Sequence, residues 1–283
     1  MERQLLLRGV LVGALGSLLV FIFARIFAEP QIESAIAYEA GRDATQAVLD
    51  KAAGLPTAAA DPDIFSRTLQ SNLGAGVGMI LFGVAVGALF AVTYAVCLGR
   101  VGNIQPRVLA LLVSAAGFLA VYLVPFVKYP ANPPAIGSPD TIKERGALYL
   151  LMMFCSVLFL VAAVWLGQRL GKRFGNWNAS ALAGATFVVA IGIVIAILPS
   201  PGHLAGNEQP FGHQTTETPL PLTNASGAIV YPGFPADVLF DFRLYSVAAQ
   251  LILWATIGLV FAPMAERLLK AQPGTAKPER LRC

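Results

Sequence analysis

The residues best suited to chemistry are two histidines and two glutamates late in the chain: His203, Glu208, His213 and Glu217. Imidazole and carboxylate together are ligands that divalent late transition-metal ions prefer. The intervals of 5, 5 and 4 residues match no rigid metal-binding motif. The pattern therefore has two readings, polar decoration of a surface loop and weak metal capture.

A second acidic group lies near the start of the chain, where Glu29 and Glu33 stand one helical turn apart. Nearby carboxylates raise the local negative potential and attract cations. The same residues also fit the solvated face of a helix. The full set of candidate metal contacts is Glu29, Glu33, His203, Glu208 and His213.

Motifs for catalysis or for a tightly bound cofactor are absent from the sequence. The glycine-rich stretch 74–78 lacks the Lys-Ser/Thr pair of a phosphate-binding loop, and neither H-E-x-x-H nor C-x-x-C occurs. Three scattered cysteines show no disulfide framework. We therefore expect no enzymatic activity, no catalytic residues and no resident cofactor.

The composition is that of an integral membrane protein. Of 283 residues, 56% are hydrophobic and only 13% are charged, and the mean hydropathy is +0.67. Soluble domains carry about twice that share of charge. The pI of about 9.1 reflects basic residues at the ends of apolar blocks, so we expect a lipid bilayer and no nucleic acid as partner.

Six apolar stretches are long enough to cross a bilayer, which requires about 20 residues in a helix. They cover residues 5–27, 73–98, 108–127, 147–166, 180–198 and 244–263. The sequence thus predicts an all-α, polytopic helical bundle that forms one membrane domain, 1–283. The first stretch lacks a clear small-residue cleavage site, so we expect it to be retained, with a cleaved signal as the alternative.

The basic residues predict that both termini lie in the cytoplasm. Twelve of the twenty Lys and Arg fall in the terminal segments, at the start of the first span, and in the connections after the second and fourth spans. Cytoplasmic segments are enriched in these residues. Thirteen of the sixteen Asp and Glu fall elsewhere, which makes the outer side acidic. The expected location is the inner membrane of a bacterium.

Three connections, 28–72, 128–146 and 199–243, are then expected on the outer side. The first shows apolar residues at helical spacing and should be an amphipathic helix. The second is rich in proline and should form a stiff strap along the membrane surface. The third is long and holds both histidines, and long loops are usually functional or disordered.

Several residues near or within the spans have two readings. Gly9 and Gly13, with the glycines at 74, 76, 78, 83 and 87, have the spacing of close helix packing or of a sliding interface. Arg25 and Arg243 either reach toward the interface or pair with acidic neighbours at the mouth of a pathway.

Two further patterns also leave alternatives. Met152, Met153 and Cys155 either pack or line a path for a soft metal. A basic–apolar–Gly–Asn pattern repeats at 100–103 and 173–176, as a duplicated hairpin or a recurring turn.

The sequence resembles the CbtA family of cobalt transporter subunits. The likeness runs through RGVLVGALGSLLVFIFARIFAEPQIESAIAYE, YLVPFVKYPANPPAIGSPDTIKERGALYLLM, GNWNASALAG and FPADVLFDFRLYSVAAQLILWATIGLVFA. It implies a membrane protein of five or six spans and a small single-span partner, CbtB, that carries histidines. Because this chain has only two histidines, a metal site would draw on that partner, on Asp and Glu, or on backbone carbonyls.

The expected function is therefore uptake of a divalent metal, cobalt in the first place, with capture at the acidic outer segments. Passage through the bundle would need polar backbone near Pro125 or the side chains of Thr93, Tyr122 and Gln250. The alternative is a non-transporting accessory subunit that scaffolds a larger membrane complex, in keeping with the glycine-rich surfaces.

Overall fold

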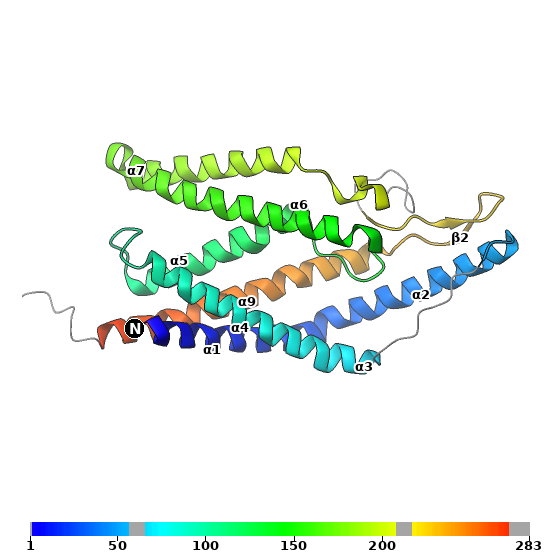
Figure 1. Cartoon of the computed structure of the whole chain (residues 1–283), viewed down its shortest axis with the longest axis horizontal. Helices are drawn as coiled ribbons and strands as arrows, with labels where there is room; N and C mark the ends of the chain where they lie inside the picture. The colour runs from blue at the N-terminus through cyan, green and yellow to red at the C-terminus, as the bar shows by residue number, and fades with distance from the viewer. Residues whose placement is uncertain (1, 57–65, 208–216, 272–283) are drawn as a thin grey trace, which may run out of the picture. The chain divides into compact units, whose positions relative to one another are not determined.

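The computed structural model describes residues 2–56, 66–207 and 217–271, and most of these residues are helical (Figure 1). The α-helices are α1 (Glu2–Phe23), α2 (Glu29–Ala52), α3 (Arg67–Leu69), α4 (Ala75–Cys97), α5 (Pro106–Gly117), α6 (Val124–Lys128), α7 (Ile142–Ile197) and α9 (Ala236–Lys270). Shorter elements are the π-helical turns η1 (Ala24–Ala28), η2 (Gln70–Gly74) and η3 (Phe118–Leu123), the 3-10 turns η4 (Pro139–Thr141) and η5 (Pro201–His203), and the strands β1 (Leu222–Thr223) and β2 (Ile229–Tyr231). The predicted all-α class is confirmed.

Five helical stretches of the described residues are long and apolar enough to cross a membrane. They are Glu2–Phe27, Arg67–Cys97, Pro106–Lys128, Pro139–Asn207 and Ala236–Lys270. The fourth contains two of the six expected spans, 147–166 and 180–198, and each of the others corresponds to one, with 73–98 extending one residue past Cys97. The chain is thus a polytopic membrane bundle, while its cytoplasmic termini and its unity as one membrane domain stay predictions.

The chain divides into two compact units. The first comprises Met1–Phe21, Gly74–Leu119 and Gln250–Cys283, and the second comprises Ile22–Leu73 and Ala120–Ala249. Each unit has its own packing.

In the first unit, α1 and α4 approach each other through glycine. A Cβ atom placed on Gly13 would overlap the carbonyl of Gly83, and one on Gly9 would overlap the carbonyl of Gly87. Gly9 contacts Gly87 and Gly13 contacts Gly83, so the two helices are antiparallel. Close backbone approach of this kind drives helix association in lipid, where apolar side chains gain nothing by leaving the hydrocarbon. Gly9, Gly13, Gly83 and Gly87 therefore serve close packing, whereas Gly78 faces open space.

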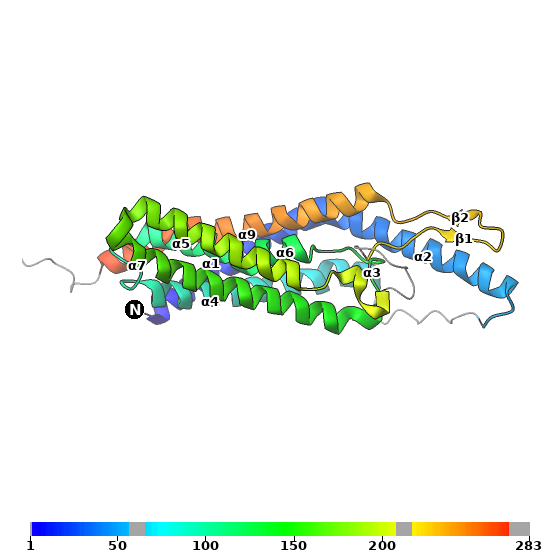
Figure 2. The same ribbon diagram turned by 90° about the horizontal axis from the view of Figure 1, so that it is seen from above.

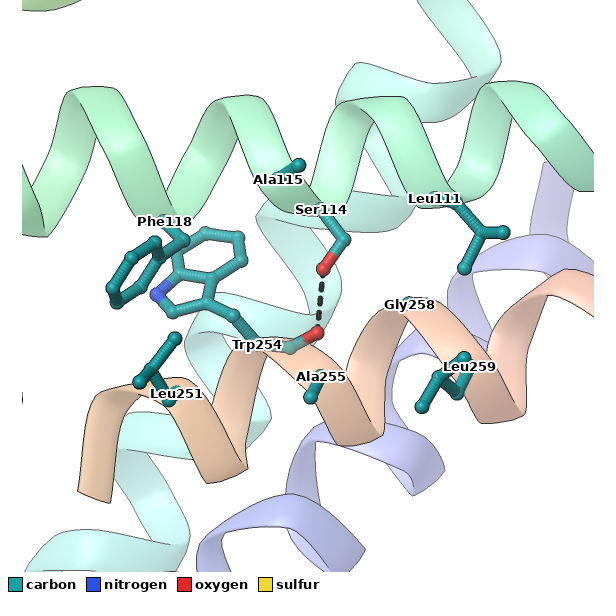
Figure 3. Close-up of a pocket in the computed structure, with 9 residues that line it drawn as sticks. All are labelled: Leu111, Ser114, Ala115, Phe118, Leu251, Trp254, Ala255, Gly258 and Leu259. Atoms are coloured by element: carbon teal, nitrogen blue, oxygen red, sulfur yellow. Dashed lines mark hydrogen bonds between the residues drawn. The ribbon is translucent and has the colours of Figure 1, made fainter. Parts of the chain in front are cut away.

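The same unit joins α5 to α9 around Trp254 and Ser114 (Figure 3). The Ser114 hydroxyl donates to the Trp254 carbonyl at 2.5 Å, and Gly117 and Gly258 leave space for the indole ring and for Ser114. An open pocket of about 240 Å³ beside them is lined almost entirely by apolar atoms. Because its lining is almost entirely apolar, this pocket is poorly suited to a cation.

In the second unit, α7 folds back on itself at Gly175 (Figure 1). Gly175 has φ 75° and ψ 161°, a conformation open essentially to glycine alone. A Cβ on Gly167, before the reversal, would lie 3.4 Å from the Cβ of Ala183 after it, so the two halves pack as an antiparallel pair. Gly102 also has a positive φ, at the matching position of the repeated pattern. Both occurrences of the pattern therefore contain a glycine-dependent reversal.

Replacing Gly175 with alanine should cost about 1–3 kcal/mol of stability, because the Cβ strains the backbone while the space around it is open. The matched control is Gly184→Ala on the second half of α7, where the surroundings are equally open but the backbone is helical. Thermal melting of the two purified variants in detergent measures the difference. Equal melting temperatures would contradict the role given to Gly175.

Helix α2 packs against the β1–β2 hairpin and the segment after it (Figures 1 and 2). Tyr38 donates to the Pro232 carbonyl and Tyr231 donates to the Tyr38 carbonyl, each at 3.0 Å. Burial raises the pKa of the Tyr38 phenol, which keeps it a neutral donor. Phe234 and Ile136 complete this small core. Segments from all three expected outer connections therefore meet here.

Candidate functional site

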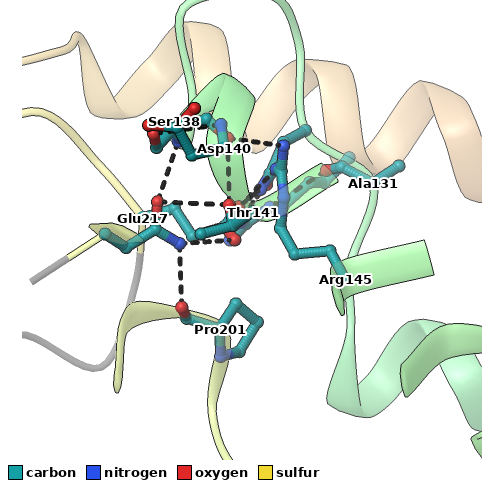
Figure 4. Close-up of polar contacts among 10 residues, drawn as sticks. Ala131, Ser138, Asp140, Thr141, Arg145, Pro201 and Glu217 are labelled. Atoms are coloured by element: carbon teal, nitrogen blue, oxygen red, sulfur yellow. Dashed lines mark hydrogen bonds and ion pairs between the residues drawn. The ribbon is translucent and has the colours of Figure 1, made fainter. Parts of the chain in front are cut away.

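A set of buried polar contacts in the second unit surrounds Glu217 (Figure 4). We call the set Asn132, Arg145, Asn207, Glu217 and Arg243 the Glu217 cluster. Asn132 lies in the connection before η4, and Arg145 lies in the first turns of α7. Asn207 follows η5, Glu217 precedes β1, and Arg243 lies in the first turns of α9. The cluster thus ties together segments that lie far apart in sequence.

Both oxygens of Glu217 are used within the cluster. Oε2 accepts from Arg145 Nη1 and from Asn132 Nδ2, each at 2.9 Å, and Oε1 accepts from Asn207 Nδ2 at 3.1 Å. The side chain of Glu217 is only 2% exposed. A buried carboxylate is stable in this setting because its charge is paired and its lone pairs are bonded.

Asn207 extends these contacts to the turn that precedes α7. Its Oδ1 accepts from the Ser138 amide at 2.8 Å, and its Nδ2 also donates to the Pro201 carbonyl at 2.8 Å. Gly137 has φ 89°, and a Cβ there would lie only 2.5 Å from Arg145 Nη1. Glycine at 137 is therefore required both by the backbone and by the approach of the guanidinium.

Arg243 holds the proline-rich strap from the opposite side. Its Nη2 donates to Asn132 Oδ1 at 2.7 Å and its Nε donates to the Ala131 carbonyl at 3.3 Å. The cluster contains two guanidinium groups, from Arg145 and Arg243, and one carboxylate. Its excess positive charge disfavours a cation. The cluster therefore acts as a structural contact that holds these segments together.

Among the predicted metal contacts, Glu29 is engaged by arginines. Its Oε1 lies 2.5 Å from Arg67 Nη2 and 3.5 Å from Arg25 Nη1, and the side chain is 12% exposed. Of the two readings for Arg25, pairing with an acidic neighbour is therefore present. Two cations already balance the charge that would attract a metal ion to Glu29.

The other predicted contacts are distributed differently. Glu33 is exposed on α2, and His203 is exposed at the end of η5. Glu208 and His213 lie outside the described residues. Within 2–56, 66–207 and 217–271, no group of three or more His, Cys, Asp or Glu is arranged to hold a metal ion.

Sequence reasoning did not identify Asn132, Arg145 and Asn207 as partners of Glu217. The available signal was the density of polar residues in the strap and its flanks, KYPANPPAIGSPDTIKERG, within an otherwise apolar chain. Arg243 was recognised as unusual, but its expected partners were acidic neighbours. Its hydrogen bonds go instead to the Asn132 side-chain amide and the Ala131 carbonyl of the strap.

A second pocket, of about 690 Å³, lies between the end of α2 and the segment 220–225. Arg42 donates across it to the Leu220 carbonyl at 2.7 Å, and Gln46 donates to Asp50 at 2.8 Å. Its charged groups, Arg42 and Asp50, are opposite in sign, so the pocket has no clear preference for a cation.

Comparison with known proteins gives one result. A family model described as "Probable cobalt transporter subunit (CbtA)" matches residues 2–266. No curated protein and no solved structure matches the chain.

Proposed function

The chain belongs to the CbtA family of probable cobalt transporter subunits, and from this premise we propose that it carries divalent cobalt across the bacterial inner membrane. The proposed direction is inward, with the first contacts on the acidic side of the protein. Its support is the uneven charge of the connections, with most acidic residues outside the segments that hold most Lys and Arg.

The proposed first contacts are Glu33, His203, Glu208 and His213, with Glu29 in a supporting role. Glu33 and His203 are exposed and accessible to ions. Glu29 is bound to Arg25 and Arg67, so it contributes by holding the start of α2 in place. Of the residues near these contacts that the structure describes, Asn207 and Glu217 are hydrogen-bonded to each other at 3.1 Å.

The two predicted histidines give the first test. In cells that depend on this protein, His203→Ala combined with His213→Ala should raise the cobalt concentration needed for half-maximal uptake by about tenfold, the effect of roughly 1.4 kcal/mol of lost binding. The control Glu144→Gln removes an exposed acidic charge that is not a proposed ligand. Uptake is measured with labelled cobalt under limiting supply.

Two outcomes would reject parts of this proposal. Cobalt accumulation that does not change when the gene is deleted would remove the transport function. Normal transport by the double histidine variant would remove only the capture site.

A histidine-bearing single-span subunit of the CbtB kind fits the proposal as a partner. The chain has two histidines, and its described residues contain no three-ligand group of His, Cys, Asp or Glu. Such a subunit would supply the imidazoles that late transition-metal ions prefer.

The accessory role remains as a second candidate function. The glycine contacts between α1 and α4 and the lack of clustered metal ligands in the described residues favour it. Purification of a stoichiometric larger complex whose stability does not respond to cobalt would support scaffolding over transport.

A further inference from the structure

One buried hydroxyl in the first half of α7 has no bonding partner in the part of the chain that the structure describes. The Ser156 side chain is 0% exposed, and its Oγ makes no hydrogen bond. A buried polar group without a partner costs free energy, and a water or an ion bound beside it is one arrangement that satisfies it.

Several other helix hydroxyls of this protein are bonded to backbone carbonyls. Thr93, Thr186 and Ser246 each donate to the carbonyl four residues earlier, at 2.8–2.9 Å. Ser114 donates to Trp254 on another helix. Back-bonding to the preceding turn is thus the usual arrangement here, and Ser156 departs from it.

Met152 lies on the same face of α7, one turn before Ser156, and is also 0% exposed. At a rise of 1.5 Å per residue, Met152 and Ser156 stand about 8 and about 14 Å into the span that begins at residue 147. The two side chains therefore place a thioether sulfur and a hydroxyl oxygen on one buried face at membrane depth. Both atoms can coordinate a divalent transition-metal ion.

The turn η3, which precedes the neighbouring helix α6, offers a carbonyl oxygen at a similar depth. Helix α6 packs against α7, and Pro125 within it is fully buried. Proline has no N–H, so one carbonyl of the preceding π-helical turn η3 lacks its helical donor. Counted from residue 127 at the end of its span, that turn lies about 10 Å deep. The strap joins residue 127 to residue 147, so both depths are counted from the ends that the strap connects.

We propose that Met152 and Ser156, together with a backbone carbonyl of η3, form a transit site for a partly dehydrated divalent cation within the membrane. The proposal rests on the transport function argued above. Few and weak ligands suit transit, because an ion must leave a conduction site as readily as it binds.

The transport test uses purified full-length protein in proteoliposomes with labelled cobalt. Ser156→Ala and Met152→Leu should each lower the rate of cobalt uptake about tenfold. Two matched controls should transport normally: Thr186→Val, which removes a back-bonded hydroxyl of α7, and Met153→Leu, which removes the adjacent, half-buried thioether.

Thermal melting of the same variants separates binding from packing. If Ser156 only packs, Ser156→Ala should leave transport unchanged and leave the melting temperature equal or higher, because it removes an unsatisfied hydroxyl. Unchanged uptake in both Ser156→Ala and Met152→Leu would overturn the site while leaving the transport function intact.

A binding measurement decides the case even if the protein alone does not transport cobalt. Ser156→Cys introduces a thiol at the proposed site, and cobalt added to this purified variant should produce a sulfur-to-cobalt charge-transfer band that Ser156→Ala lacks. The band should weaken when Met152→Leu is added. Its absence from Ser156→Cys would overturn the transit site, whereas its presence without transport by the wild type would reject only the transport function.

Discussion

Replacing Arg145 with methionine should destabilise the protein by about 3–5 kcal/mol, because it leaves Glu217 as a buried carboxylate without its ionic partner. The change also removes the donor to the Ser138 carbonyl, which lies 3.4 Å from Arg145 Nη2. Thermal or denaturant-induced unfolding of the purified protein in detergent measures the loss.

Two further variants test whether the loss in Arg145→Met comes from the unpaired Glu217 carboxylate. Lys143→Met removes an exposed positive charge two residues earlier and should have almost no effect. Glu217→Gln added to Arg145→Met should recover part of the lost stability, because the buried group is then neutral. If Arg145→Met and Lys143→Met unfold alike, the Glu217 cluster does not stabilise the fold as we describe.

Leucine in place of Gly83 should separate α1 from α4 and cost about 3 kcal/mol. The Cβ alone would overlap the Ser17 hydroxyl, and it would lie 2.6 Å from the Gly13 carbonyl oxygen. Backbone cannot move aside as a flexible side chain can, so the whole helix must shift. Thermal melting in detergent, together with the yield of monodisperse protein, measures the effect.

Gly78→Leu provides the matched control for this prediction. Gly78 belongs to the same helix, but a Cβ there meets nothing within 4 Å. The substitution should therefore leave the melting temperature nearly unchanged. Equal losses at the two positions would mean that insertion of a large side chain into α4, and not the contact with α1, is responsible.

The membrane-spanning helices could be predicted because their length and apolar character are set by the bilayer itself. This requirement acts on each segment separately, without knowledge of its neighbours. The glycine spacing in α1 and α4 was informative for a related reason, since in lipid small residues mark the places where backbones meet.

The Glu217 cluster could not be predicted, because all but one of the bonds within it join residues 72 to 111 positions apart. Nothing in the local sequence distinguishes Glu217 from an exposed acidic residue of a loop. The spacing of His203, Glu208, His213 and Glu217 therefore suggested one group, whereas the structure bonds Glu217 to arginine and asparagine. Glu29, in the acidic group near the start of the chain, shows the same effect, since its partner Arg67 is 38 residues away.

The single-residue reversal at Gly175 affects how the membrane protein is made. With helical backbone on both sides of one glycine, little chain is left to form an aqueous loop between the two apolar segments. The two apolar segments should therefore leave the translocon together as a preformed helical hairpin. Neither segment should be released into the bilayer on its own. A reporter domain spliced in at this position should abolish membrane assembly.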